Sequence, residues 1–248
     1  MSLRLRRGIA GGLEQIFFDY GAPSGSGGDE SSDNVVLQFL FDETSGSITD
    51  EVASQSLTTV NGTPSYNQSL SGVYENLSPE IVMNEASFED AVSSPSWEIG
   101  TSDFTWEFWY REINLGITSN VVIQFNQGAG GSERSYIDIQ RPDATNVTLA
   151  LRVYDGAGLL AVDFSTTYAA INNSSSNHFR IAVDRDNSSG AEGFLNGVSL
   201  GTANPTARQG SVDSDVLAIG SLTGGSLGIN GGLSETRLSL NATNNSYG

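Results

Sequence analysis

The segment FTWEFWYR, residues 104 to 111, holds the side chains with the clearest potential for ligand chemistry. Alternate residues of a strand point to opposite faces, so Glu107, Trp109 and Arg111 share one face. An aromatic ring can stack on a sugar while charged neighbours hydrogen bond to its hydroxyl groups. These three residues form a candidate carbohydrate site. The alternative is that a loop or a neighbouring subunit simply covers this face.

Three acidic residues form a candidate calcium site in the turn after the first predicted strand. They are Asp42, Glu43 and Asp50. Calcium prefers roughly 6 to 8 hard oxygen ligands, which carboxylates supply. The alternative is an acidic turn that is only solvated, and no other cofactor is expected.

Catalysis through a Ser/His/Asp system would have to use His178, which is the only histidine. This residue opens a predicted strand and has no nucleophile elbow nearby. We therefore expect His178 to be a structural or surface residue at the end of a strand.

Apolar and polar residues alternate along most of the chain after residue 34, which indicates strands. Asn196-Gly197 is the dipeptide preferred in two-residue type I′ hairpins. The predicted strands are VVLQFLF (35–41), LTTV (57–60), FTWEFWY (104–110), VVIQF (121–125), YIDIQ (136–140), VTLALRVY (147–154), LLAVDF (159–164), FRIAV (179–183), FL (194–195), VSLG (198–201), VLAIG (216–220) and LSETRLS (233–239).

This pattern predicts an all-β fold, a two-sheet antiparallel jelly-roll sandwich with an extended N-terminal arm. The face of Phe104, Trp106, Phe108 and Tyr110 is expected to lie in the core. Only residues 78–92 have a spacing that would suit a short helix, and irregular structure suits them equally well.

Composition excludes several classes of partner. The formal charge of −18 repels nucleic acid and anionic membranes. The chain has no cysteine, so neither disulfides nor cysteine-ligated metals are available. No apolar run reaches the roughly 20 residues of a membrane span. We therefore expect a soluble protein, and because the first residues lack the continuous apolar core of a signal peptide we expect no secretion signal.

The N-terminal region divides into an arm and a linker. Residues 1–20 carry three arginines against two acids, whereas the rest of the chain is strongly acidic. Residues 21–34 are rich in Gly and Ser, which is typical of a flexible linker. Residues 35–248 are then expected to form the sandwich domain.

The arm has the composition of a docking segment, with arginines for acidic surfaces and apolar side chains for a groove. A frayed terminus is the alternative. The residues expected to dock are Leu3, Arg4, Leu5, Arg6, Arg7, Ile9, Leu13, Ile16, Phe17 and Phe18.

Five segments, in order, resemble the concanavalin A-like (laminin-G-like) jelly-roll family. They are residues 35–51, 104–111, 178–202, 215–221 and 228–239, and together they extend over about 35–240. Asn177 stands where many relatives have Trp, and residues 62–100 match no family motif clearly. The resemblance implies a jelly-roll sandwich.

Members of this family act as sugar-binding modules, adhesion domains, glycoside hydrolases and bacteriophage appendage domains. The hydrolase branch places an Asp two residues after the first of two Glu on one strand. No glutamate of this chain has an Asp at that position, so we expect a protein that is not an enzyme. The start LRLRRG, residues 3–8, also resembles the start of some phage tail and appendage proteins.

The leading hypothesis is therefore a structural protein of a virus particle, such as a bacteriophage decoration or appendage protein. Its arm would dock onto capsid or tail proteins, and its jelly roll would face outward, where it could contact a host glycan. The alternative is a free carbohydrate-binding module. A homo-oligomer is expected because closed symmetry is common in such assemblies.

Overall fold

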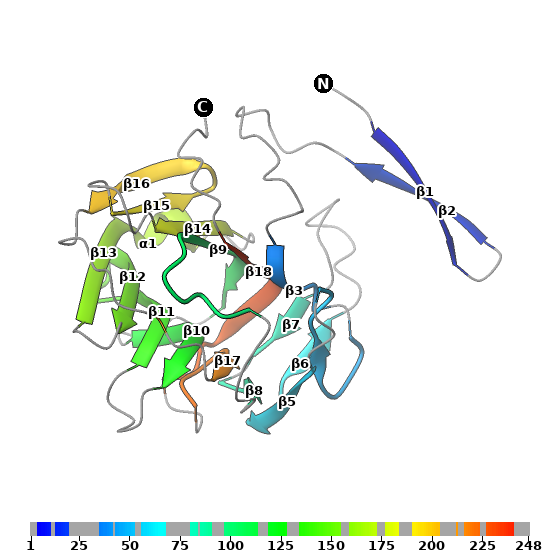
Figure 1. The fold of residues 1–248 in the computed structure, drawn as a ribbon, viewed down its shortest axis with the longest axis horizontal. Helices are drawn as coiled ribbons and strands as arrows, with labels where there is room; N and C mark the ends of the chain where they lie inside the picture. Colours follow the sequence, from blue (N-terminus) through cyan, green and yellow to red (C-terminus); the bar gives the residue numbers. More distant parts are fainter. Residues whose placement is uncertain are drawn as a thin grey trace.

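The chain folds as two antiparallel sheets packed face to face, with a separate two-stranded hairpin at its N-terminal end (Figure 1). The computed structural model describes residues 4–10, 13–19, 35–41, 43–52, 56–67, 80–83, 85–90, 97–113, 119–127, 134–154, 159–172, 177–183, 190–203, 212, 216–223 and 227–240.

The first sheet contains β13, and we call it the β13 sheet. Its strands, in spatial order, are β13 (Leu159–Thr167), β12 (Asn146–Tyr154), β11 (Arg134–Gln140), β10 (Ser119–Gln127), β17 (Leu217–Ile219), β8 (Ser87–Asp90), β5 (Ser56–Asn61) and β4 (Ile48–Thr49). A single-turn helix, α1 (Tyr168–Ile171), follows β13 in the chain.

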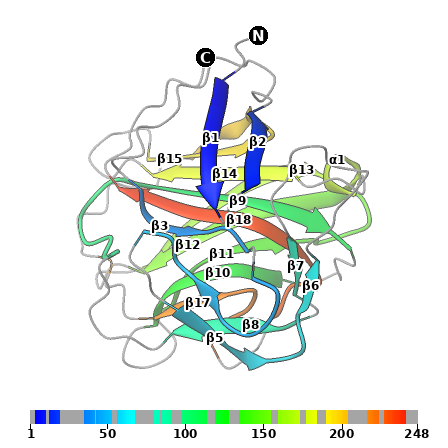
Figure 2. The ribbon, with the colours of Figure 1, turned by 90° about the vertical axis from the view of Figure 1, so that its right-hand side faces the viewer.

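The second sheet, which we call the β9 sheet, carries the candidate site. Its strands, in spatial order, are β16 (Val198–Ala203), β15 (Ala191–Leu195), β14 (Asn177–Val183), β9 (Phe104–Glu112), β18 (Gly231–Leu240), β7 (Glu80–Val82) and β6 (Ser65–Asn67). The strand β3 (Val35–Phe39) also pairs with β18. Figure 2 shows β18 running beside β9, so the middle of the sheet joins segments far apart in the chain.

The all-β two-sheet sandwich predicted from the sequence is confirmed, and each predicted strand is present. The short-helix interpretation of residues 78–92 is wrong, because β7 and β8 lie there. These strands have three and four residues, which is too short for a clear period of two. The strand β4, which has two residues, was also not predicted.

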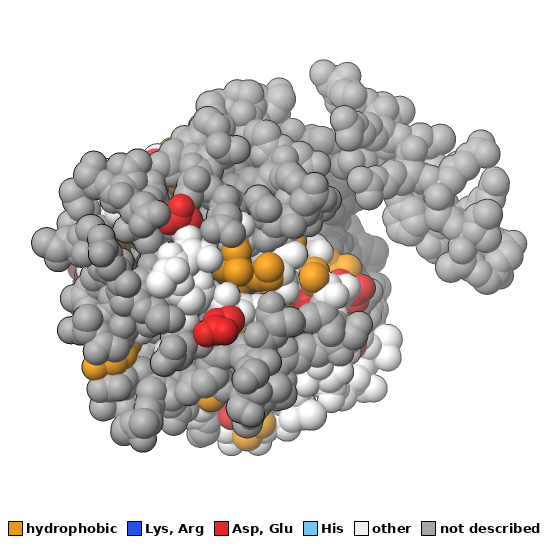
Figure 3. Space-filling model, in the orientation of Figure 1, with side chains coloured by type: hydrophobic (Ala, Val, Ile, Leu, Met, Phe, Trp, Pro, Cys, Tyr) orange, Lys and Arg blue, Asp and Glu red, His pale blue; other side chains and the backbone are white. Residues whose placement is uncertain are grey.

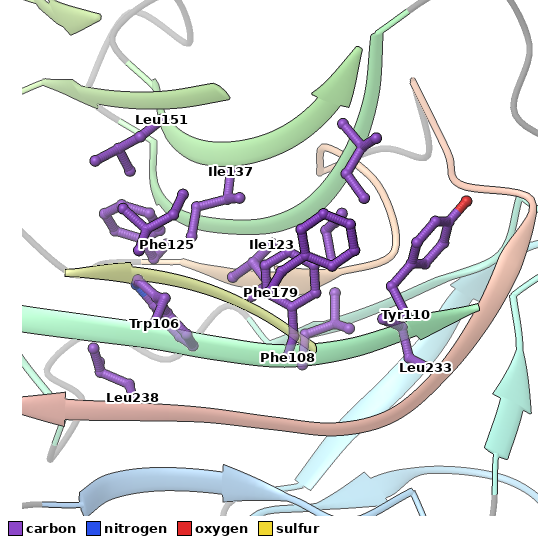
Figure 4. Close-up of a cluster of buried hydrophobic side chains, with 14 of the residues drawn as sticks. Trp106, Phe108, Tyr110, Ile123, Phe125, Ile137, Leu151, Phe179, Leu233 and Leu238 are labelled. Carbon is purple, nitrogen blue, oxygen red and sulfur yellow. The ribbon is translucent and has the colours of Figure 1, made fainter. Parts of the chain in front are cut away.

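Aromatic residues from both sheets fill the core (Figure 4). Phe108 of β9 stacks on Phe179 of β14, with ring centroids 5.3 Å apart. Trp106 reaches across to Phe125 of β10, with centroids 5.8 Å apart. A fully buried side chain of this size contributes about 1.5–3 kcal/mol to folding, so this cluster holds the sheets together.

The β15–β16 turn confirms the hairpin predicted from Asn196-Gly197. Both residues have positive φ, 51° for Asn196 and 77° for Gly197. A type I′ turn requires this conformation at both positions. The turn sets Leu195 opposite Val198 and thereby fixes the register of β15 and β16.

The predicted N-terminal arm contains two strands, β1 (Arg4–Ala10) and β2 (Leu13–Asp19), which pair antiparallel. Their register sets Leu5 opposite Phe18, Arg6 opposite Phe17 and Arg7 opposite Ile16. Leu3 lies outside the described residues. Docking by the arm stays a prediction, as do the boundaries at residues 20 and 34.

The charged side chains of described residues that are visible on the face in Figure 3 are acidic, in line with the net charge of −18. Among the described residues, no helix has the length and apolar character needed to cross a membrane.

Candidate functional site

The candidate site lies on the outer face of the β9 sheet, opposite the core. As predicted, Phe104, Trp106, Phe108 and Tyr110 point inward and are fully buried. The intervening residues of β9 point outward. Glu107 is buried there, whereas Trp109 and Arg111 are half-buried. The structure therefore brings the three predicted sugar-site residues to one face.

Glu107 is the centre of an ion network that joins three strands. The register sets it opposite Arg237 of β18, and sets the next outward residue, Trp109, opposite His178 of β14. Arg237 donates from Nε to Glu107 Oε2 at 2.7 Å, and its Nη2 lies 2.6 Å from the same oxygen. His178 Nε2 lies 3.4 Å from Glu107 Oε1. Each carboxylate oxygen thus has its own partner.

These contacts outweigh the effect of burial on the Glu107 carboxyl. Burial alone would raise its pKa, but the hydrogen bond with His178 and the charge of Arg237 lower the pKa to about 2. Glu107 is therefore ionised at neutral pH. A carboxyl group in this state accepts hydrogen bonds and cannot serve as the proton donor of a glycosidase.

Arg111 forms a second ion pair on the same face. Its Nε donates to Glu80 Oε2 at 2.7 Å, and its Nη2 donates to Glu80 Oε1. Glu80 belongs to β7 and its side chain is fully buried. Its carboxylate fits because the neighbouring residue on β18 is Gly232. A Cβ on Gly232 would lie 2.1 Å from Glu80 Cδ.

Trp109 packs against His178, with ring centroids 4.8 Å apart and the planes tilted by 32°. The backbone of His178 is fixed in turn, because its N–H donates to Asn196 Oδ1 at 2.9 Å. Asn196 also donates from Nδ2 to Asn177 Oδ1 at 3.0 Å. The turn that closes the β15–β16 hairpin thus helps to hold the aromatic part of the site.

Sequence reasoning did not identify three residues of these two groups of ion pairs. They are Glu80, His178 and Arg237. Glu80 lies in β7, a strand of three residues that is too short to show a period in the sequence. His178 was expected to be structural or at the surface, and the half-buried residue does lie at a strand end, but within the candidate site. Alternation in LSETRLS is enough to place Arg237 on the outward face of its strand. It does not show that Glu107 is the partner of Arg237.

Two of the predicted calcium ligands bind backbone amides. Asp50 Oδ1 accepts from Gln38 N at 2.6 Å and from Val52 N at 3.2 Å. Glu43 Oε1 accepts from Thr49 N at 2.6 Å. Asp42 lies outside the described residues. Within the described part of the chain, no group of three or more His, Cys, Asp or Glu is placed to hold a metal ion.

Solved structures of low sequence identity share this fold. The binding domain of Paraclostridial Mosquitocidal Protein 1 matches with a TM-score of 0.60 and 17% identity, over 86% of this chain and 50% of that chain. The botulinum neurotoxin serotype G binding domain matches with a TM-score of 0.59 and 13% identity, over 85% and 49%. Domain 4 of AbnA, a GH43 extracellular arabinanase from Geobacillus stearothermophilus in complex with arabinotriose, matches with a TM-score of 0.54 and 12% identity, over 84% and 92%.

The chain spans about half the length of the two toxin binding domains and most of the arabinanase domain. At these identities the matches show a shared β-sandwich fold. No protein-family model matches the sequence, and no curated protein sequence matches it.

Proposed function

We propose that this chain is a non-enzymatic, lectin-like module that binds a glycan on the outer face of the β9 sheet. The observation that carries the proposal is the half-buried Trp109, which packs on His178 beside two arginine–glutamate ion pairs. An aromatic ring with hydrogen-bonding groups around it is the arrangement that sugars require.

Ion pairs between strands hold the side chains of the site in place. Glu107 connects β9, β14 and β18, while the pair of Arg111 and Glu80 connects β9 to β7. Side chains that are already fixed lose little conformational entropy on binding, so more of the contact energy appears as affinity.

Two further observations favour binding over hydrolysis. Glu107, with its pKa of about 2, cannot act as a general acid at neutral pH. The structures that share the fold include two toxin binding domains and an arabinanase domain in complex with arabinotriose. These matches make a sugar the first ligand to test.

A glycan array with the full chain and with Trp109→Ala tests the proposal. We expect saturable binding by the full chain and at least a tenfold loss in the variant, about 1.4 kcal/mol or more. Tyr136→Ala is the matched control, because Tyr136 is a half-buried aromatic residue of β11 in the other sheet. Absence of glycan binding, or full binding by Trp109→Ala, would refute the proposal.

We also propose that residues 1–20 anchor the sandwich to a larger assembly, in the first instance a virus particle. The supporting observation is that β1 and β2 form their own two-stranded sheet. An isolated hairpin is only marginally stable in water, so a partner surface would stabilise it. Arginines and apolar residues in its sequence suit an acidic, grooved partner.

Deletion of residues 1–20 tests this second role. The shortened chain should keep its β-sheet circular dichroism and should be missing from purified particles that incorporate the full chain. Equal incorporation of both chains would show that the arm is not the anchor.

A further inference from the structure

The polar side chains around Trp109 are layered, with two carboxylates below and two arginines and a histidine above. The side chains of Glu80 and Glu107 are 0% and 7% exposed. Those of Arg111, His178 and Arg237 are 21%, 24% and 27% exposed. A ligand that approaches this face therefore meets the cationic and aromatic groups first. We call Trp109, Arg111, His178 and Arg237 the donor patch.

The acceptor atoms beneath the donor patch already have partners within the protein. Both oxygens of Glu80 accept from Arg111, and the two oxygens of Glu107 face His178 and Arg237 separately. Three of the four accessible side chains are guanidinium or indole groups, which donate hydrogen bonds and accept none, and His178 is the fourth. The exposed layer is thus suited to a ligand rich in acceptors.

One more acid, Glu235, lies near the patch. It accepts from Gln38 Nε2 at 2.9 Å, and Gln38 pairs with Arg237 in the sheet. Glu235 is close in sequence to Arg237 on β18, so its charge opposes an anionic ligand nearby. Removal of this charge should strengthen binding of such a ligand.

We infer that the glycan bound here carries a carboxylate, as in a uronic acid or a sialic acid. This inference rests on the proposed sugar-binding function and narrows its ligand class. A carboxylate accepts hydrogen bonds from cations that are roughly twice as strong as neutral ones, and the planar fork of arginine fits its two oxygens. A neutral sugar would use the same donors more weakly.

The net charge of −18 does not prevent this. At physiological salt the screening length is about 8 Å, so acids elsewhere on the surface contribute little at the patch. Contacts with half-buried guanidinium groups act at hydrogen-bonding distance and are screened much less.

Calorimetric titration of the full chain with two matched sugar pairs tests the inference. The pairs are sialyllactose with lactose, and tetragalacturonate with its methyl ester. We expect the acidic member of at least one pair to bind about tenfold more tightly than its neutral partner, as one charge-assisted bond would give. Equal affinities within both pairs would overturn the inference while leaving glycan binding intact.

Three single variants test whether the preference for acidic over neutral sugars arises at the donor patch. Arg237→Gln should reduce the ratio of acidic to neutral affinity to near one, whereas Glu235→Gln should increase it. Arg152→Gln removes the same charge from the opposite sheet, where Arg152 pairs with Asp163, and should leave the ratio unchanged. An unchanged ratio in Arg237→Gln, with its fold verified by circular dichroism, would overturn the assignment.

If Arg237→Gln does not fold, the double variant Glu80→Gln/Arg111→Gln replaces it, because it neutralises both members of the second pair together. This variant should also lower the ratio. Failure of every sugar to bind the full chain would refute the proposed function itself, so the two ideas fail in distinguishable ways.

Discussion

Two arginine–carboxylate pairs lie on the outer faces of the two sheets, and they differ in which partner faces solvent. On the β13 sheet, Arg152 Nη1 lies 2.7 Å from Asp163 Oδ1, and the Asp163 side chain is 56% exposed. On the β9 sheet, Arg237 pairs with Glu107, whose side chain is only 7% exposed. Both are arginine–carboxylate ion pairs, but the carboxylate is the more exposed member on the β13 sheet and the arginine is the more exposed member on the β9 sheet.

The member of the ion pair that is buried determines how much the pair contributes to the order of the surface. In the pair on the β13 sheet the Asp163 carboxylate is exposed, so water competes for its charge and the pair gains little. A buried carboxylate must keep its partners, since an unpaired charge in the interior is costly. Glu107 therefore fixes the positions of Arg237 and His178, and the β9 sheet presents an ordered cationic surface that the β13 sheet lacks at this pair.

Lowering the pH should have the largest effect, because it removes the stabilising contribution of the buried Glu107 carboxylate. The pKa of Glu107 is lowered from 4.5 to about 2, so its stabilising contribution is complete above pH 4.5 and is lost as the pH falls to about 2. The loss corresponds to about 3 kcal/mol of unfolding free energy. Urea unfolding measures the free energy of unfolding at pH 6 and at pH 2. Between these two pH values it should fall by about 3 kcal/mol more in the native chain than in Glu107→Gln. Parallel pH profiles would contradict it.

Alanine at each arginine compares the two pairs directly. Arg237→Ala leaves Glu107 buried with His178 alone, so the unfolding free energy should fall by about 2 kcal/mol at pH 7. Arg152→Ala should cost about 1 kcal/mol, because Asp163 is solvated and the substitution otherwise removes only the hydrogen bonds of Arg152 to the carbonyls of Leu151 and Val162. Chemical denaturation of both variants measures the difference. Equal losses would mean that burial of the acid has no energetic consequence.

A substitution at Gly232 sharpens the comparison at the second ion pair of the β9 sheet. Gly232→Ala should cost about 1–2 kcal/mol, because the new Cβ would collide with the Glu80 carboxylate that holds Arg111. The same substitution in a Glu80→Ala background should cost less, and this double-mutant cycle gives the coupling. Additive losses would show that Glu80 does not set the need for glycine.

The sequence predicted the parts of the fold that depend on neighbouring residues. Nine residues of β9 alternate clearly enough to assign the core side and the outer side. The Asn196-Gly197 turn is equally local, since two positive φ values require those residue types. The strands β4 and β7, of two and three residues, are too short to show a period and were not predicted.

The candidate site could be predicted only in part, for the same reason. Glu107, Trp109 and Arg111 lie on one strand, so alternation alone places them together. Their partners come from other strands, and Arg237 is 130 residues from Glu107 along the chain. Pairing at that distance follows from sheet order and register, which no local pattern encodes.

The position of β18 also has a consequence for how the protein folds as it is made. This strand lies between β9 and β3, and the hydrogen bond from Gln38 to Glu235 spans 197 residues. During synthesis β3 and β9 leave the ribosome before β18 is made. Until then their edges are unpaired and can associate with other chains. Folding should therefore be slow and completed only after β18 emerges, and chaperones should increase the yield.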